Sequence, residues 1–175
     1  NSVEKDKSVA HLIENLSKNL ITSYDINAKT HWKWFEDYMT YANSILPEAM
    51  LYTYKVTGKE PYKRIAIESF DFLLSKMFMN SHFKVISNKS WYYKDTTPNP
   101  YGEQPIDVAY TIQALDVFYK TFKDPMYKTM QQIAFRWFLG KNHLNQIMYN
   151  PATGGCYDGL EKENVNINQG AESTI

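Results

Sequence analysis

Apolar residues recur along most of the chain at the spacing of one helix face. From Pro61 onward they stand three and four positions apart, as Tyr62, Ile65, Ala66, Phe70, Leu73, Leu74 and Met77. Another helix has clear ends, because Asp124 suits the N-cap, Pro125 the first helical position and Gly140 the position after the last turn. The pattern predicts six helices, at residues 3–21 and 43–56, from Pro61, and at 105–119, 125–139 and 169–175.

Two kinds of helix alternate in this prediction. The first, third and fifth have a polar face, whereas the second and fourth are apolar almost all round. A helix that is apolar on every side is normally buried on every side. The even-numbered helices are therefore predicted to form an inner layer and the odd-numbered helices an outer layer.

A short internal repeat supports this arrangement. Residues 57–61 (Thr-Gly-Lys-Glu-Pro) recur as residues 121–125 (Thr-Phe-Lys-Asp-Pro), 64 positions later, which is the length of one outer and one inner helix. Repeated helix pairs that cannot bury their apolar faces alone stack on their neighbours. The sequence therefore predicts an all-α array or ring of antiparallel helix hairpins.

The connections between helices are unequal in length. Residues 22–41, 80–104 and 141–168 form long connections from an outer to an inner helix, whereas the turns near Gly58 and Lys123 are short. Long connections without regular structure usually have a function. All three are predicted to lie at one end of the array, where the inner helices begin and offer unpaired N–H groups and partial positive charge.

These long connections are rich in aromatic, acidic and amide side chains. Sugars need such a mixture, since flat rings cover their C–H patches while Asp, Glu, Asn and Gln bind their hydroxyl groups. Glycoside hydrolysis also needs two carboxyl groups, about 5–5.5 Å apart for retention or about 6.5–9.5 Å apart for inversion. The candidate carboxyl groups are Glu36, Asp37, Glu103, Asp107, Asp158 and Glu172.

We select site residues from these connections as hypotheses. The candidates for catalysis are Asp37, Glu36, Asp107 and Asp158. The candidates for sugar binding are Trp34, Trp91, Gln104, Asn43, Gln169 and Glu172. Glu36 and Asp37 form the strongest pair, because aromatic residues flank them in the sequence and are expected to enclose them.

Structural alternatives stay open for the same residues. Asp107 and Glu172 would complement the dipoles of the helices in whose first turns they are predicted to lie. Asp158, between two glycines, would be a turn residue. Trp34 and Trp91 would cover the hydrophobic core beneath the connections.

Charge and composition argue against several classes of protein. Nineteen basic residues balance nineteen acidic ones and no basic run occurs, which argues against binding to nucleic acid or to an anionic membrane surface. No apolar stretch approaches the roughly 20 residues of a membrane-spanning helix. Residues 1–7 show no signal-peptide core, and a cytoplasmic location is favoured. The alternative of a signal peptide that has been removed stays open, because the chain lacks an initiator Met.

No cofactor or metal ion is expected. Cys156 is the only cysteine, so the chain has no intrachain disulfide framework and no Cys-rich zinc site. We expect Cys156 to be a structural thiol, because no His stands near it at motif spacing. The sequence also lacks a Gly-rich phosphate loop and a His-Glu-x-x-His metal motif.

Five motifs occur in order between Trp32 and the end of the chain. They are 34–37 (Trp-Phe-Glu-Asp), 104–107 (Gln-Pro-Ile-Asp), 135–140 (Phe-Arg-Trp-Phe-Leu-Gly), 154–160 (Gly-Gly-Cys-Tyr-Asp-Gly-Leu) and 168–174 (Asn-Gln-Gly-Ala-Glu-Ser-Thr). Together they resemble the glycosidase-related helical domain attached to many bacterial group-1-type glycosyltransferases. That resemblance implies the (α/α)6 toroid of six-hairpin glycosidases and sugar 2-epimerases, and a function in carbohydrate metabolism without a settled reaction.

A complete toroid has six hairpins, and about three are predicted here. The 175 residues are therefore expected to form a single partial domain, similar to the C-terminal half of the ring. The expected function is to bind or process a sugar at the face of the long connections; the alternative is a non-catalytic scaffold that supports a glycosyltransferase. The open sides of a half-ring are expected to be covered by a second copy, as in a homodimer, or by the remainder of a parent chain.

Overall fold

The computed structural model describes residues 2–79 and 82–173. In this part, the helices are α1 (Ser2–Asn27), α2 (Ile45–Thr57), α3 (Glu60–Met77), α4 (Pro105–Phe122) and α5 (Pro125–Phe138). Three antiparallel two-stranded sheets pair β1 (Tyr38–Met39) with β4 (Tyr92–Tyr93), β2 (Phe78–Met79) with β3 (His82–Phe83), and β5 (Gly159–Leu160) with β6 (Val165–Asn166). The chain is mostly helical but not purely all-α, because its long connections form these sheets.

The predicted sixth helix is absent from the described residues. Residues 171–173 form a turn, and residues 174 and 175 lie outside the described part. Asp158 explains the turn, since its Oδ1 accepts hydrogen bonds from Gly170 N at 2.8 Å and from Ser173 Oγ at 2.6 Å. The side chain of Asp158, which is distant in the sequence, thus holds Gly170 and Ser173 in a turn in place of the predicted helix.

The start of α5 agrees with the prediction from the sequence, whereas the end of α1 differs from it. The side chain of Asp124 accepts a hydrogen bond from Met126 N at 2.8 Å, and Pro125 is the first residue of α5. The first helix runs beyond the predicted end at Ile21 to Asn27. No Gly or Pro stands between Ile21 and Pro47 to end it, and the buried Tyr24 anchors its last turns in the core.

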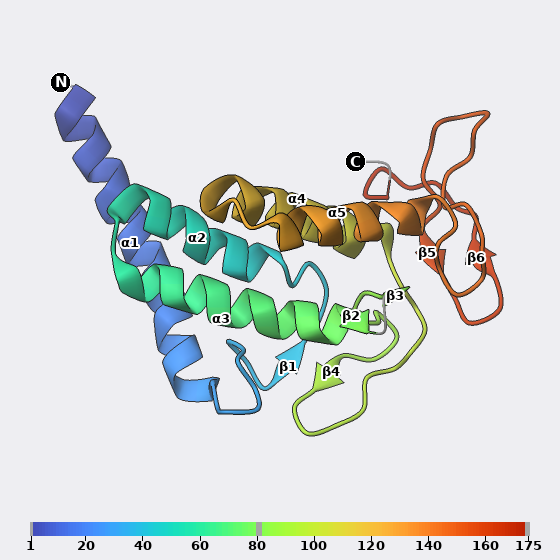
Figure 1. The fold of residues 1–175 in the computed structure, drawn as a ribbon, viewed down its shortest axis with the longest axis horizontal. Coiled ribbons are helices and arrows are strands. Elements are labelled where there is room, and N and C mark those ends of the chain that lie inside the picture. Colours follow the sequence, from blue (N-terminus) through green and yellow to red (C-terminus); the bar gives the residue numbers. More distant parts are fainter. Residues whose placement is uncertain (1, 80–81, 174–175) are drawn as a thin grey trace.

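The helices form antiparallel hairpins. Helix α2 packs on α3 and α4 packs on α5, while α2 also contacts α4. Figure 1 shows α1 crossing the α2–α3 hairpin where α2 ends and α3 begins, and it shows α2 and α4 beginning at the opposite end of the array, near the C-termini of α3 and α5. The second and third long connections begin at this end, which we call the loop end, and the first reaches it from the C-terminus of α1.

The two short turns begin with the same left-handed C-cap conformation. Gly58 after α2 and Lys123 after α4 have φ values of 69° and 60°, and each donates its N–H to the carbonyl of the residue four positions earlier. These caps are 65 positions apart (123 minus 58), one more than the 64 of the sequence repeat. The repeat therefore marks two equivalent hairpin turns whose registers differ by one residue.

Side chains of the helices and of the long connections together form the core, but some apolar side chains remain outside it. Phe70 of α3 and Phe118 of α4 are buried with their ring centroids 4.2 Å apart. By contrast, Leu16 of α1 and Tyr52 of α2 are 66% and 46% exposed. Helix α2 is thus not buried on every side. Among the described residues, no helix combines the length and the hydropathy needed to cross a membrane.

Candidate functional site

A backbone-to-side-chain hydrogen bond joins the first long connection to the start of α4 at the loop end. The N–H of Ala42, just before α2, donates to Oδ1 of Asp107, in the first turn of α4, with an N···O distance of 2.5 Å. Beside this bond, the hydroxyl groups of Ser44, the N-cap residue of α2, and Thr111, one turn further along α4, are 2.9 Å apart. These contacts fix the end of the first connection against the start of α4.

A cleft of about 450 Å³ opens beside this junction. Its volume lies within the range of small-molecule sites, about 300–1,000 Å³. Three segments supply its lining: the first connection with the start of α2, the first turns of α4, and the C-terminal turn. The lining side chains with the chemistry to contact a sugar are Glu36, Tyr41, Asn43, Ile106, Tyr110 and Glu172. The structure thus brings together three predicted site residues, Glu36, Asn43 and Glu172.

Asp107 lies behind the wall of this cleft. The residue is 4% exposed, while its neighbour Ile106 and its hydrogen-bond partner Ala42 both line the cleft. Its second oxygen, Oδ2, is buried and meets no hydrogen-bond donor among the described residues. Burial raises the pKa of Asp107 to about 7, although the Ala42 N–H lowers it. This carboxyl group therefore changes its protonation near neutral pH, as groups in functional sites often do.

Two lining residues are held in place by local hydrogen bonds. The amide of Asn43 accepts from the backbone N–H of Thr40 and donates to the carbonyl of Thr40, at 3.1 Å each. The carboxylate of Glu36 accepts a hydrogen bond from the hydroxyl of Tyr38 at 3.1 Å. Asn43 therefore shapes the wall of the cleft, while Glu36 keeps one oxygen that no described side chain occupies.

Trp34 and Asp37 do not have the surroundings that the sequence suggested. Trp34 is completely buried, 5.3 Å from Phe35 between ring centroids, so it offers no ring face to a ligand and belongs to the core. The side chain of Asp37 is 66% exposed and lies 3.4 Å from Lys94 Nζ. Because the preceding aromatic residues turn toward the core, they do not enclose this carboxylate.

Trp91 and Gln104 lie at the loop end but outside the cleft. Trp91 is 49% exposed and stacks on Tyr38, with ring centroids 5.1 Å apart. Gln104 is the N-cap residue of α4, and its side chain makes no capping hydrogen bond. Neither residue lines the cleft that holds Glu36 and Glu172.

Asp158, Gln169 and Cys156 stabilise the last connection. The hydrogen bond from the Ser173 hydroxyl, and then that from the Gly170 N–H, lower the pKa of Asp158, so its carboxylate stabilises the turn that contains Glu172. Gln169 accepts a hydrogen bond from the Thr153 hydroxyl. The buried Cys156 donates to the carbonyl of Met148 at 3.0 Å, and burial raises the pKa of its thiol to about 11, which suits a structural thiol.

Glu103, which we named as a candidate carboxyl group but did not select as a site residue, is buried and has a partner at each of its carboxyl oxygens. It is 2% exposed, its Oε2 accepts from Trp137 Nε1 at 2.9 Å, and its Oε1 lies 3.2 Å from His143 Nδ1. Burial raises the pKa of Glu103. These partners are 34 and 40 positions away, so no local pattern could have revealed them.

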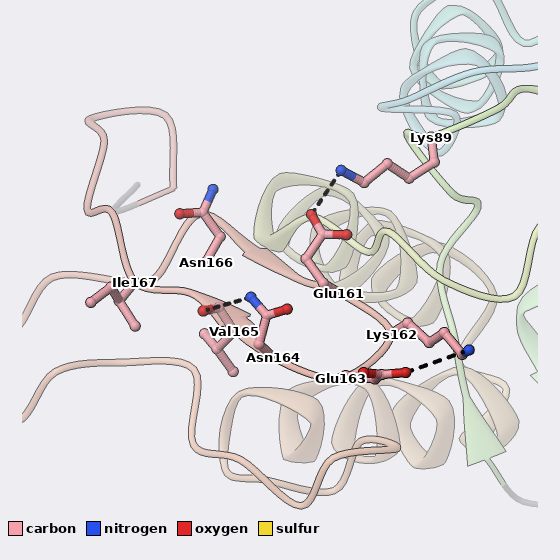
Figure 2. Close-up of a pocket in the computed structure, with 8 residues that line it drawn as sticks. All are labelled: Lys89, Glu161, Lys162, Glu163, Asn164, Val165, Asn166 and Ile167. Carbon is pink, nitrogen blue, oxygen red and sulfur yellow. Dashed lines mark hydrogen bonds and ion pairs between the residues drawn. The ribbon is translucent and has the colours of Figure 1, made fainter.

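A second hollow, of about 660 Å³, lies on the β5–β6 hairpin and shares no lining residue with the cleft. Figure 2 shows that its charged side chains pair with one another, Lys89 with Glu161 at 3.0 Å and Lys162 with Glu163 at 3.5 Å. Its lining contains no aromatic ring. The cleft at the start of α2 and α4 is therefore the better candidate for a ligand site.

In the described ranges, no three His, Cys, Asp or Glu side chains are grouped so that they could hold a metal ion. No protein-family model and no curated protein matches the chain.

Proposed function

We propose that the chain is a glycosidase-like domain of carbohydrate metabolism that binds a sugar in the cleft at the loop end. The lining of that cleft carries the proposal. The carboxylates of Glu36 and Glu172 stand in one concave site with the rings of Tyr41 and Tyr110. Carboxylates accept hydrogen bonds from sugar hydroxyl groups, and tyrosine rings cover the C–H patches of the sugar ring.

We extend this proposal to the architecture. The α2–α3 and α4–α5 hairpins, with α2 against α4, are the packing that successive hairpins of an (α/α)6 toroid would have. In our proposal the chain forms about half of such a ring. The cleft would then open toward the centre of the ring, at the N-termini of its inner helices.

The accessible carboxyl groups define what chemistry the cleft would support. Glu36 and Glu172 line it, so acid–base work on a bound sugar, whether hydrolysis or epimerisation, would use these two. In hydrolysis one carboxylic acid protonates the glycosidic oxygen while the other carboxylate acts as base or nucleophile. Asp107 would be a positioning residue, because it holds the backbone of Ala42 from behind the wall.

Calorimetric titration tests the proposal. The probes are glucose, galactose, mannose, N-acetylglucosamine and their oligosaccharides of two to six units. At least one probe should bind, and Glu36→Gln and Glu172→Gln should each weaken it about 10-fold, the effect of losing one charge-assisted hydrogen bond. Glu163→Gln, the same change on the hairpin, is the matched control. The proposal fails if no probe binds, or if both cleft variants bind like the control.

One observation favours an interaction domain as the second candidate. Leu12 and Leu16 on α1, and Tyr52 and Val56 on α2, expose large apolar side chains. Such residues are normal when scattered, but a continuous group marks an interaction surface. This candidate gains support if the sugar titrations fail while the chain associates through these helices.

A further inference from the structure

The outward face of the β1–β4 sheet carries aromatic rings that the cleft does not use. Across the two strands, Tyr38 pairs with Tyr93 and Met39 pairs with Tyr92. Because side chains alternate between the faces of a strand, Met39 and Tyr92 share the inward face, whereas Tyr38, Tyr93 and Trp91 share the outward one. Met39 and Tyr92 are buried, but Trp91 and Tyr93 remain 49% and 48% exposed.

The three outward rings form one surface, which we call the aromatic platform (Tyr38, Trp91 and Tyr93). Trp91 lies 5.1 Å from Tyr38 between ring centroids, with 22° between the ring planes. Tyr93 lies 6.3 Å from Trp91 and 6.0 Å from Tyr38. The rings therefore contact one another while two of them leave about half of their surface to solvent.

The platform is not needed to anchor the sheet. On the inward face, Tyr92 packs edge-on against the buried Trp32, with ring centroids 5.3 Å apart, and Met39 is completely buried. These two residues already join both strands to the core. A second set of large rings on the solvent side is therefore available to contact a ligand.

The platform is continuous with the cleft. The hydroxyl of Tyr38 donates to Oε1 of Glu36 at 3.1 Å, and Glu36 lines the cleft. Polar groups stand at the end of the same sheet, where Asp37 and Lys94 are 3.4 Å apart and their strands are joined by a backbone hydrogen bond from Lys94 N to Asp37 O. A ligand leaving the cleft past Glu36 would meet ring faces bordered by hydrogen-bonding groups.

We propose that the aromatic platform is a second sugar-stacking subsite, which holds further units of a glycan chain that extends out of the cleft. This inference rests on the proposed function, and it narrows the ligand from a free monosaccharide to an oligosaccharide or polysaccharide. The charges favour a neutral glycan, because the acidic and basic groups at the sheet end are paired with each other. Each pyranose ring offers a C–H face to an aromatic ring and hydroxyl groups to the bordering residues.

Trp91 provides a specific signal for this subsite. The other three tryptophans, Trp32, Trp34 and Trp137, are at most 2% exposed, so acrylamide quenching of tryptophan fluorescence reports on Trp91. We would titrate the chain with maltohexaose, cellohexaose, mannohexaose and the hexamer of N-acetylglucosamine, and with the matching mono- and disaccharides. At least one hexasaccharide should protect Trp91 from acrylamide, whereas its monosaccharide should bind the cleft without protecting it.

Variants test whether the rings contribute to affinity. Trp91→Ala should weaken hexasaccharide binding about 3- to 10-fold, as loss of one aromatic contact would, and leave monosaccharide binding unchanged. Trp91→Phe, which keeps a ring, should recover part of the affinity. Tyr52→Ala, which removes an exposed ring on α2, is the matched control and should change neither. Urea unfolding of each variant verifies that the fold is retained.

The outcomes separate the two proposals. If monosaccharides and hexasaccharides bind with equal affinity and Trp91 stays open to acrylamide, the platform proposal fails while the cleft proposal stands. If no probe binds, both fail. If Trp91 becomes protected with rising protein concentration and no sugar, the rings form a contact between copies of the chain, which also overturns the platform proposal.

Discussion

The indole Nε1 of Trp137, in the last turn of α5, donates a hydrogen bond to Oε2 of Glu103, 2.9 Å away, and both side chains are buried. The imidazole of His143 contacts the other carboxyl oxygen through Nδ1, and its Nε2 lies 2.8 Å from the carbonyl oxygen of Glu161. These contacts tie the segment before α4 to the end of α5 and to the hairpin that follows. Such donors offset the free-energy cost of burying a carboxyl group.

Removing the indole donor should destabilise the fold. We expect Trp137→Phe to lower the free energy of unfolding by about 1–3 kcal/mol, because a buried carboxyl oxygen loses its hydrogen bond. Urea denaturation measures this loss, with the exposed Trp91→Phe as the matched control. Equal midpoints for the two variants would show that the Trp137–Glu103 hydrogen bond contributes little.

Asp107 should make stability depend on pH. Its pKa is about 7 in the folded chain and about 3.9 in an unfolded one, so the folded state holds a proton that the unfolded state releases between these values. Stability should therefore fall as pH rises from about 4 to about 7, by roughly 4 kcal/mol at most for this group, and level off above that. Asp107→Asn should flatten this decline, as measured by thermal unfolding across the pH range.

Asp116 provides a control, because its effect on the pH dependence of stability has the opposite sign to that of Asp107. Its hydrogen bond with Lys120 lowers the pKa of Asp116, so its carboxylate stabilises the fold above the unfolded pKa and loses this effect as pH falls. Asp116→Asn should therefore lower stability at neutral pH and leave the decline between pH 4 and 7 in place. An Asp107→Asn variant whose pH profile matches that of the wild type would contradict the assignment.

Tyr24 joins the end of α1 to α3 through its hydroxyl group, which donates to Oε2 of Glu68 at 2.7 Å. Tyr24→Phe keeps the ring that packs edge-on against Phe35 and removes only the hydroxyl. We expect a loss of about 0.5–1.5 kcal/mol in the free energy of unfolding, the usual value for one hydrogen bond. Tyr149→Phe, at an exposed tyrosine, should change it much less; similar losses in both would reject the α1–α3 link.

The exposed apolar side chains of α1 and α2 should promote self-association. We expect light scattering to show dimers at micromolar concentration, with a two-fold interface that covers Leu12 and Leu16. Leu12→Glu together with Leu16→Glu should shift the equilibrium toward monomer. Ile167→Glu, at another exposed apolar position, should not. A monomer at every concentration tested would exclude this interface.

Asp37 remains a candidate for ligand contact at the sheet end. Because its side chain is exposed and pairs with Lys94, Asp37→Asn should change the free energy of unfolding by about 1 kcal/mol or less. A weaker response to the hexasaccharides in the same variant would indicate that the carboxylate binds sugar. A large fall in melting temperature with unchanged sugar affinity would instead make Asp37 a structural brace.

The helices were predictable from the sequence because a helix is held by contacts three and four residues apart. The N-cap Asp124, the prolines that begin α4 and α5, and the apolar stripe of α3 are all local signals. The predicted helix after Gln169 was wrong for a non-local reason. Asp158 accepts the N–H of Gly170 from 12 positions away and holds a turn instead.

The order of residues along the chain is enough to show which side chains stand on the long connections, and it therefore predicts that carboxylates and rings gather at the loop end. Which of them are exposed depends on the tertiary fold. Trp34 and Trp91 both stand on such connections, yet Trp34 is completely buried and Trp91 is 49% exposed. Strand pairing turns Tyr92 inward and its neighbour Trp91 outward. Likewise Asp107 is 4% exposed and its burial raises its pKa, whereas the side chain of Asp37 is 66% exposed. Exposure and protonation depend on the neighbours that folding assembles, and local sequence does not contain them.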